Sequence, residues 1–370
     1  MSHPMLAERA ASTRPNLLAP LGNLLRSRGC YEEALDLAGR ETAIAMRQGN
    51  LPALRQALAN KGHAYARLGR LDETQEVLRL EEDCCHKIAD DVALQGCLGR
   101  RAALLADRGD LEAASCLFEE QLNLCESIGN EWAASEALGA LGQIRRMQGH
   151  GGRAAAIHER EERLSRKLGD REGIASSLMH RGSVELSEGQ RERAMALFQR
   201  AEAEYRSIGI TSGTAAAIGN QALVLRAMGD LDDALDRACE ATAIFEELGE
   251  TGEVATGYGN QATILALQGR VKEALELQQR REALCREHGF QYMLQRCLGA
   301  QVRLLADGPG PALALSKASE REQLCRDLGV TQDLIDALGQ RAALLRKTGE
   351  RVEALALFKE KARLIRETES

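Results

Sequence analysis

Metal-binding and acid–base chemistry in proteins depend most often on histidine, and the chain has seven. They are His3, His63, His86, His150, His158, His180 and His288. A helical zinc site such as HExxH places two histidines four positions apart, and zinc ribbons pair cysteines as CxxC. Neither spacing occurs in this chain. The sequence therefore predicts no metal site.

Nucleophilic and phosphate-binding chemistry has no signature in the sequence either. Hydrolases present their catalytic serine in GxSxG, and phosphate loops read GxxxxGK[ST] or, after a strand, GxGxxG. The chain contains none of these in the required context. We therefore expect a protein that is not an enzyme and that holds no cofactor.

Glycines repeat along the chain with a period of forty residues, and this repetition indicates how the secondary-structure elements are arranged. One series, broken only at Pro309, is Gly29, Gly69, Gly109, Gly149, Gly189, Gly229, Gly269 and Gly349. A second, displaced by half a period and broken only at Ala89, is Gly49, Gly129, Gly169, Gly209, Gly249, Gly289 and Gly329. A period of about 20–50 residues is typical of a solenoid, in which each unit buries its apolar face against its neighbours.

The nineteen residues between successive glycines have the periodicity of an α-helix. The segment 251–269, for example, has apolar residues at Val254, Tyr258, Ala262 and Leu265. Steps of four, four and three residues put these side chains on one helical stripe. Each glycine stands where a helix ends, because glycine accepts the left-handed conformation of a C-cap. The sequence predicts eighteen helices in antiparallel pairs.

These helices imply an all-α protein, an α-solenoid of about nine helix-turn-helix repeats. Small residues support close packing within each pair, because alanine recurs five residues after nearly every glycine of the first series. We expect a single array over residues 13–368, preceded by an N-terminal tail at residues 1–12. At residues 307–311 two prolines replace the standard turn, which predicts a kink or a shortened second helix there.

Most of the ten cysteines also follow the repeat. Four share one repeat position and two share another: Cys85, Cys125, Cys285 and Cys325, then Cys97 and Cys297. Equivalent residues of stacked helical units lie roughly 10 Å apart, whereas a disulfide needs Cα atoms within about 7 Å. We therefore interpret these cysteines as small core residues.

The repeat resembles the tetratricopeptide family. A small residue, a turn glycine seven positions later and an alanine five positions after that form the family's pattern, seen here as Ala262, Gly269 and Ala274. The resemblance covers about residues 13–368, and it implies a right-handed superhelix. Longer helices than usual place the chain nearest to a subgroup with forty-residue repeats.

In tetratricopeptide arrays the first helix of each pair lines the concave surface, and the resemblance therefore implies a set of groove residues here. They are Asn60, His63, Arg100, Gln143, Arg146, His180, Asn220, Arg226, Asn260, Arg303 and Arg346. Lysine and arginine outnumber acids at these repeat positions, although the whole chain has a net charge of −7. A basic groove steers acidic partners and offers arginines as carboxylate ligands. Solvated helix faces, which need polar residues in any protein, are the alternative interpretation.

The leading functional prediction is a non-catalytic interaction scaffold that binds an acidic peptide or protein segment in this groove. A sensor or regulatory array that controls a separate effector, such as a signalling ATPase or protease, is the alternative. We do not expect nucleic acid as a partner, because the chain is acidic and the groove positions contain no aromatic side chain for stacking on bases. The sequence shows no membrane-spanning stretch and no secretory signal, so we expect a cytoplasmic protein.

Overall fold

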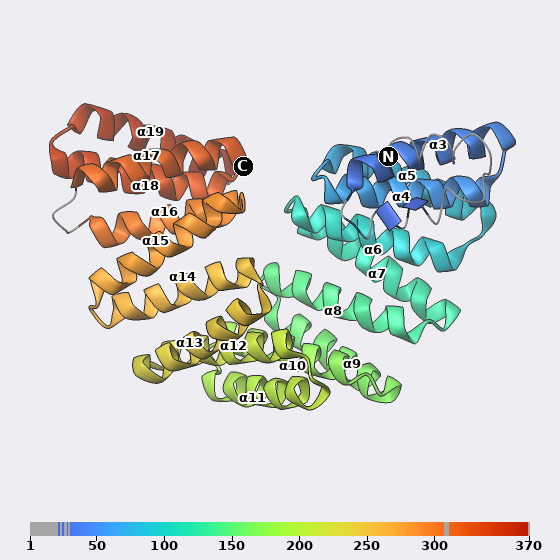
Figure 1. Cartoon of the computed structure of the whole chain (residues 1–370), viewed down its shortest axis with the longest axis horizontal. Helices are drawn as coiled ribbons and strands as arrows, with labels where there is room; N and C mark the ends of the chain where they lie inside the picture. Colours follow the sequence, from blue (N-terminus) through green and yellow to red (C-terminus); the bar gives the residue numbers. More distant parts are fainter. Residues whose placement is uncertain (1–20, 23, 26–27, 29, 307–310, 369–370) are drawn as a thin grey trace, which may run out of the picture. The chain divides into compact units, whose positions relative to one another are not determined.

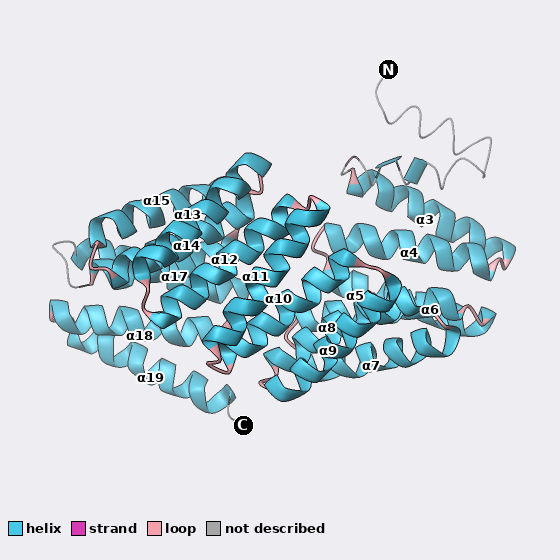
Figure 2. Ribbon diagram, turned by 90° about the horizontal axis from the view of Figure 1, so that it is seen from below, coloured by secondary structure: helices cyan, strands magenta, loops and turns pink. Residues whose placement is uncertain are grey.

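The computed structural model describes residues 21–22, 24–25, 28, 30–306 and 311–368. From Tyr31 onward, every regular element of these residues is an α-helix (Figures 1 and 2), which confirms the all-α solenoid. The helices form two compact units, which divide between Val184 and Glu185. None of the described helices has the length and apolar character needed to cross a bilayer.

The first unit contains the helices from α3 to the greater part of α10. Their bounds are α3 (Tyr31–Gln48), α4 (Leu51–Arg67), α5 (Leu71–Ile88), α6 (Asp91–Asp107), α7 (Leu111–Ile128), α8 (Glu131–Met147), α9 (Gly151–Leu168) and α10 (Arg171–Ser187). From α3 to α9, each helix packs against the next one in the chain. The even-numbered helices are the first helices of the predicted pairs, and the odd-numbered ones are the second helices.

The second unit continues this arrangement. Its helices are α11 (Arg191–Ile208), α12 (Thr211–Met228), α13 (Leu231–Leu248), α14 (Thr251–Leu267), α15 (Val271–Glu287), α16 (Gln291–Leu305), α17 (Pro311–Leu328), α18 (Thr331–Thr348) and α19 (Arg351–Thr368). Each packs against the next, and the first helices α12, α14, α16 and α18 also contact one another in turn. This second set of contacts brings the first helices of successive pairs onto a common surface of the unit.

The turn glycines adopt the conformation that the sequence predicts. Every described glycine of the two series has a positive φ, between 64° and 98°. Ala89, which replaces glycine in the second series, takes the same left-handed conformation with φ 53°. The following polar residue caps the next helix in several units, as where the Asn130 side chain accepts a hydrogen bond from the backbone N–H of Ala133. The period therefore fixes both ends of most helices.

The core contains the small residues and cysteines that the sequence assigns to it. Every alanine of the series that follows the turn glycines is buried: Ala34, Ala114, Ala154, Ala194, Ala234, Ala274, Ala314 and Ala354. The six repeat-locked cysteines are free and at most 1% exposed. Burial raises the pKa of Cys85, Cys297 and Cys325 to about 11, so these thiols stay protonated at neutral pH.

One alternative of the sequence prediction, a shortened second helix at residues 307–311, is wrong, whereas the predicted kink falls largely on residues 307–310, outside the described residues. The helix after the two prolines, α17, has 18 residues, as the other second helices α5, α7 and α9 do. Pro311 stands at its first position, where a missing N–H costs nothing. The shortened element is the first helix α16, with 15 residues. The tail at residues 1–12 and most of the first predicted helix lie outside the described residues, and the single array over 13–368 stays a prediction.

Candidate functional site

One position of each second helix faces the first helix of the next pair, nineteen residues further along the chain. We call the side chains at this position floor residues: Glu41, Glu81, Gln121, Glu161, Ala201, Ala241, Arg281, Arg321 and Lys361. Four of them contact the residue nineteen positions further on, and in three cases this residue is a predicted groove residue (Asn60, Arg100 or His180). The contacts are Glu41 to Asn60 at 3.3 Å, Glu81 to Arg100 at 2.6 Å, Glu161 to His180 at 3.5 Å and Arg321 to Gln340 at 2.9 Å.

Most long floor residues face a glycine on the preceding first helix, although the residue at the corresponding position before Glu81 is Ala59. A β-carbon at Gly99 would come within 2.8 Å of the Gln121 side chain, and one at Gly259 within 2.6 Å of Arg281. The same relation holds for Gly139 with Glu161, Gly299 with Arg321 and Gly339 with Lys361, at 2.9, 2.8 and 2.8 Å. A third glycine series of the chain therefore makes room for floor side chains.

An open cleft occurs in the second unit where the floor residue is Ala241. The cleft lies between α12 and α14 above α13 and has a volume of about 180 Å³. Its lining includes two predicted groove residues, Asn220 and Asn260, together with Thr256 and Glu253. Neither asparagine amide bonds to another described residue. The structure thus brings two predicted residues to one cavity and leaves their donors and acceptors available.

Three predicted arginines lie on first helices of the second unit: Arg226 on α12, Arg303 on α16 and Arg346 on α18. Arg303 and Arg346 are exposed and Arg226 is partly exposed. None of the three forms an ion pair with another residue in the described ranges 30–306 and 311–368. The charged floor residues here, Arg281 and Arg321 among them, are all basic. No floor carboxylate therefore neutralises the arginines of the second unit.

The predicted residues of the first unit are mostly engaged with one another or with floor carboxylates. Asn60 is buried against Glu41, and the exposed Arg100 pairs with the buried Glu81. The Gln143 amide lies 2.9 Å from Nε2 of His180. Arg146 is exposed and has no ion pair with the part of the chain that the structure describes, and His63 is exposed. Among the predicted groove arginines, the first unit therefore has one without an ion pair, Arg146, and the second has three.

His180 belongs to a cluster that the sequence analysis missed. Nδ1 of His158 lies 2.8 Å from Oε2 of Glu161, and Nδ1 of His180 lies 3.5 Å from the same oxygen. One ligand atom from each of these residues lies within 4.8 Å of the other two, in a pattern able to hold a metal ion. The two histidines are 22 residues apart on different helices, so no local spacing identifies them.

Burial controls the protonation of this cluster. His158 is fully buried, and this burial lowers its pKa although Glu161 accepts a hydrogen bond from it. For Glu161, burial alone would raise the pKa, but hydrogen bonds from His158 and His180 outweigh it and the pKa is lowered. A neutral imidazole therefore stands beside an ionised carboxylate at neutral pH.

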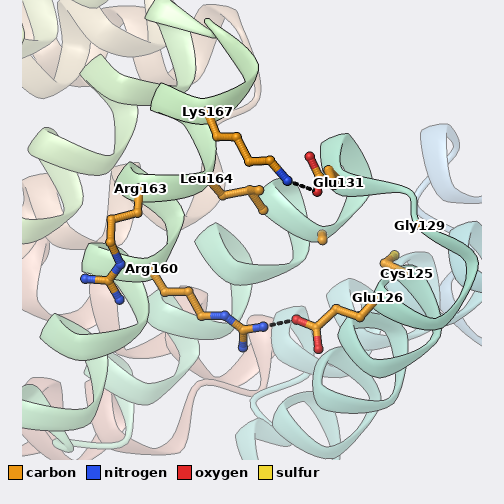
Figure 3. Close-up of a pocket in the computed structure, with 9 residues that line it drawn as sticks. Cys125, Glu126, Gly129, Glu131, Arg160, Arg163, Leu164 and Lys167 are labelled. Carbon is orange, nitrogen blue, oxygen red and sulfur yellow. Dashed lines mark hydrogen bonds and ion pairs between the residues drawn. The ribbon is translucent and has the colours of Figure 1, made fainter.

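A further pocket, of about 370 Å³, lies among α7, α8 and α9 and has two ion pairs in its lining. Figure 3 shows Arg160 reaching Glu126 and Lys167 reaching Glu131. The first pair belongs to a ladder between successive second helices, whose members are 34 residues apart. Its other members are Arg206 with Glu240 at 3.5 Å, Arg286 with Glu320 at 2.6 Å and Arg326 with Glu360 at 2.8 Å. We therefore interpret this pocket as part of the helix packing.

Comparisons with known proteins agree with this architecture. A family model described as tetratricopeptide repeat matches residues 172–247 and 213–287. No curated protein matches the chain. The repeat pattern is therefore recognisable in the middle of the chain even where overall sequence similarity is low.

Solved structures of low sequence identity share the fold. Aspartyl phosphate phosphatase F from Bacillus subtilis is 14% identical with a TM-score of 0.60, over 98% of this chain and 94% of that one. A Rap protein complexed with competence and sporulation factor is 14% identical with a TM-score of 0.62, over 95% and 97%. A signal transduction ATPase with a tetratricopeptide repeat sensor, from Pyrococcus horikoshii, is 12% identical with a TM-score of 0.60. That match covers 91% of this chain and 53% of the ATPase.

Proposed function

Because the chain belongs to the tetratricopeptide repeat superfamily, we propose that it is a non-catalytic scaffold that binds an acidic peptide or protein segment along the first helices of the second unit. The observation that carries this proposal is the cleft over Ala241, with the free amides of Asn220 and Asn260 on its walls. A Rap protein that is similar in fold is complexed with competence and sporulation factor, so one protein of this fold binds a partner.

The two asparagines provide the chemistry for holding a backbone. Each amide offers two N–H donors and a carbonyl acceptor, the same groups that a peptide bond needs to satisfy. A chain lying across the cleft would exchange hydrogen bonds with both amides. Since neither amide bonds to another described residue, this exchange would break no bond within the protein.

The arginines favour an acidic occupant. Arg226, Arg303 and Arg346 form no ion pair among the described residues, although Asp336 lies near enough to Arg303 to favour its charged form. A guanidinium binds a carboxylate through two parallel hydrogen bonds. The net charge of −7 makes the chain as a whole repel an acidic segment, so attraction must come from this local surface. We therefore expect affinity that falls as salt increases.

A substitution that introduces the residue found at the same position of another repeat tests the cleft. Ala241→Gln places in the cleft the side chain that occupies the floor position as Gln121, above Gly219, which corresponds to Gly99. The control is Ala243→Gln, the same change at an exposed position of α13. Binding would be measured by the fluorescence anisotropy of pooled twelve-residue peptides rich in Asp and Glu.

We expect the acidic pool to bind the full chain, with affinity reduced about tenfold or more by Ala241→Gln and unchanged by Ala243→Gln. A pool rich in Lys and Arg should not bind. Equal affinity of both variants, or preference for the basic pool, would contradict the proposal. Binding of duplex or single-stranded nucleic acid at moderate salt would contradict the choice of a protein partner.

A second candidate is a sensor that controls a separate effector. The observation that favours it is the match to a signal transduction ATPase, in which the aligned share is 53% of that protein and a sensor of the same repeat type is present. Affinity purification from the native source would support this function if a signalling ATPase or protease is recovered and is released by the acidic pool. Recovery of partners that contain no effector would oppose it.

The cytoplasm is the compartment that we propose for this binding. All ten cysteines are free, and thiols persist in a reducing compartment. Fractionation of the native cells would test the assignment, and recovery of the chain with an oxidising compartment would contradict it.

A further inference from the structure

We propose that His158, Glu161 and His180 form a binding site for one divalent transition-metal ion of the Zn²⁺ class. One ligand atom from each residue lies within 4.8 Å of the other two. His158 and Glu161 are one turn apart on α9, and His180 faces them from α10. Two imidazoles and one carboxylate are a donor set that suits zinc, with a fourth position left for water or a further ligand.

The repeat itself shows that His158 is exceptional. Its equivalents in the other repeats are Ala38, Leu78, Phe118, Phe198, Ala238, Gln278, Ala318 and Phe358. Seven of these eight residues are apolar, and none is a histidine. Packing therefore does not require an imidazole at this position. Only this repeat combines a histidine at the core position (His158), an acidic floor residue (Glu161) and a histidine at the groove position that faces them (His180).

The buried imidazole also has unused capacity for a ligand. His158 is 0% exposed, and its Nε2 has no hydrogen-bond partner in the structure. An unpaired polar atom in such a position costs about 1–3 kcal/mol, so a purely structural role would be expected to satisfy it.

The surroundings suit the entry and support of a metal ion. The His180 side chain is 23% exposed, so the cluster is open to solvent on that side. Nε2 of His180 lies 2.9 Å from the Gln143 amide nitrogen. Since rotation of the amide exchanges its nitrogen and oxygen, Gln143 would accept the Nε2–H of a metal-bound His180. A partner of this kind orients a ligating histidine in most metal sites.

Cobalt(II) titration of the chelator-treated full chain tests the proposal. We expect one equivalent of Co²⁺ to bind with visible d–d absorption and without the charge-transfer absorption of thiolate ligands, and Zn²⁺ to displace it. The absence of thiolate absorption separates this site from the cysteines. Two variants remove a ligand and use residues that the repeat already accepts: His158→Phe, as in Phe118 and Phe198, and His180→Asn, as in Asn220 and Asn260.

Both variants should lose the stoichiometric site, whereas His86→Asn, which changes an exposed histidine of α5, should keep it. Gln143→Ala should weaken binding by about 10–100-fold. His180→Asn lies at a partly exposed position and is expected to fold even if His158→Phe does not. Circular dichroism would verify the fold of each variant. No saturable binding to the folded chain, binding retained by folded His180→Asn, or a thiolate spectrum would overturn the proposal.

Discussion

The imidazole of His158 on α9 lies face-on against Gly142 of α8. A β-carbon built on Gly142 would come within 2.4 Å of Cε1, 2.6 Å of Nε2 and 2.8 Å of Nδ1 of that ring. Other repeats have alanine at the position of Gly142, as Ala102 and Ala222 show. The glycine is therefore required by the histidine and not by the packing of the two helices.

Gly142→Ala is accordingly expected to destabilise the chain by about 1–3 kcal/mol, because the buried ring has no space into which to move. Chemical denaturation followed by circular dichroism measures the change. The second substitution His158→Ala, which reproduces Ala38 and Ala238, should recover most of the loss. Gly152→Ala on α9 is the control, since its β-carbon would meet nothing within 4 Å. Additive losses in the double variant would show that the two residues do not compete for space.

The stability of the chain should fall between pH 7 and pH 5 partly because of His158. Burial lowers the pKa of His158 below its ordinary value of 6.5, so the folded chain keeps the ring neutral. The unfolded chain takes up a proton there as the pH falls through about 6.5, and the free energy of unfolding decreases. Glu161, whose pKa is also lowered, contributes stability that is lost at lower pH, below its ordinary value of 4.5.

Chemical denaturation at pH 7 and pH 5 measures this difference. The wild-type chain should lose about 1 kcal/mol more than His158→Phe over this interval, because the variant has no ring to protonate. His86→Asn, at an exposed position, should behave as the wild type does. Equal pH dependence of wild type and His158→Phe would show that the pKa of the ring is the same in the folded and the unfolded chain.

Charge-reversal variants test whether the acidic peptides bind to the arginines of the second unit or to those of the first. Arg226→Glu combined with Arg303→Glu removes two guanidinium groups that form no ion pair in the described residues. We expect the affinity for the acidic peptide pool to fall more than tenfold, with a weaker dependence on salt. Arg100→Glu is the control in the first unit, where Glu81 already neutralises the native arginine. A larger loss from Arg100→Glu would place the binding surface in the first unit instead.

The fold could be predicted from the sequence because the turn residues repeat without a shift in register. Gly129 and Gly169, for instance, end their helices in the left-handed conformation, and Asn130 caps the next helix as expected. Asn220 and Asn260 were found because they share a repeat position, and a shared repeat position becomes a shared surface in a stacked array.

The histidine cluster and the pairing of Arg100 with Glu81 could not be predicted from the sequence. They depend on contacts between side chains that occupy different repeat positions on neighbouring helices. His158 and His180 are at unrelated positions of the repeat, and only the packing of α9 on α10 brings them to Glu161. A histidine at a position that other units fill with apolar residues was the available signal. The pairing of Arg100 with Glu81 was hidden in the same way, because the floor position lies on the preceding second helix. Counting charges on the first helices alone overestimated the free positive charge of the first unit.

The floor residues Arg281 and Arg321, which lie in successive repeats, differ in their hydrogen bonding. Arg281 is buried, its Nε has no hydrogen-bond partner, and burial lowers its pKa. Arg321 is buried as well, but it donates to Gln295 and Gln340. A buried cation without partners is costly, whereas loss of one that is hydrogen-bonded leaves other groups unsatisfied.

Arg281→Ala should therefore leave stability unchanged or raise it by about 1 kcal/mol, and Arg321→Ala should lower it by about 1–2 kcal/mol. Denaturation midpoints of the two variants measure this difference. Arg281→Ala should also open between α14 and α16 a cleft like the one over Ala241, because Gly259 and the new alanine would repeat the arrangement of Gly219 and Ala241. If both substitutions destabilise the chain equally, Arg281 has partners in solution that compensate its burial, and the floor of the second unit is less strained than its contacts indicate.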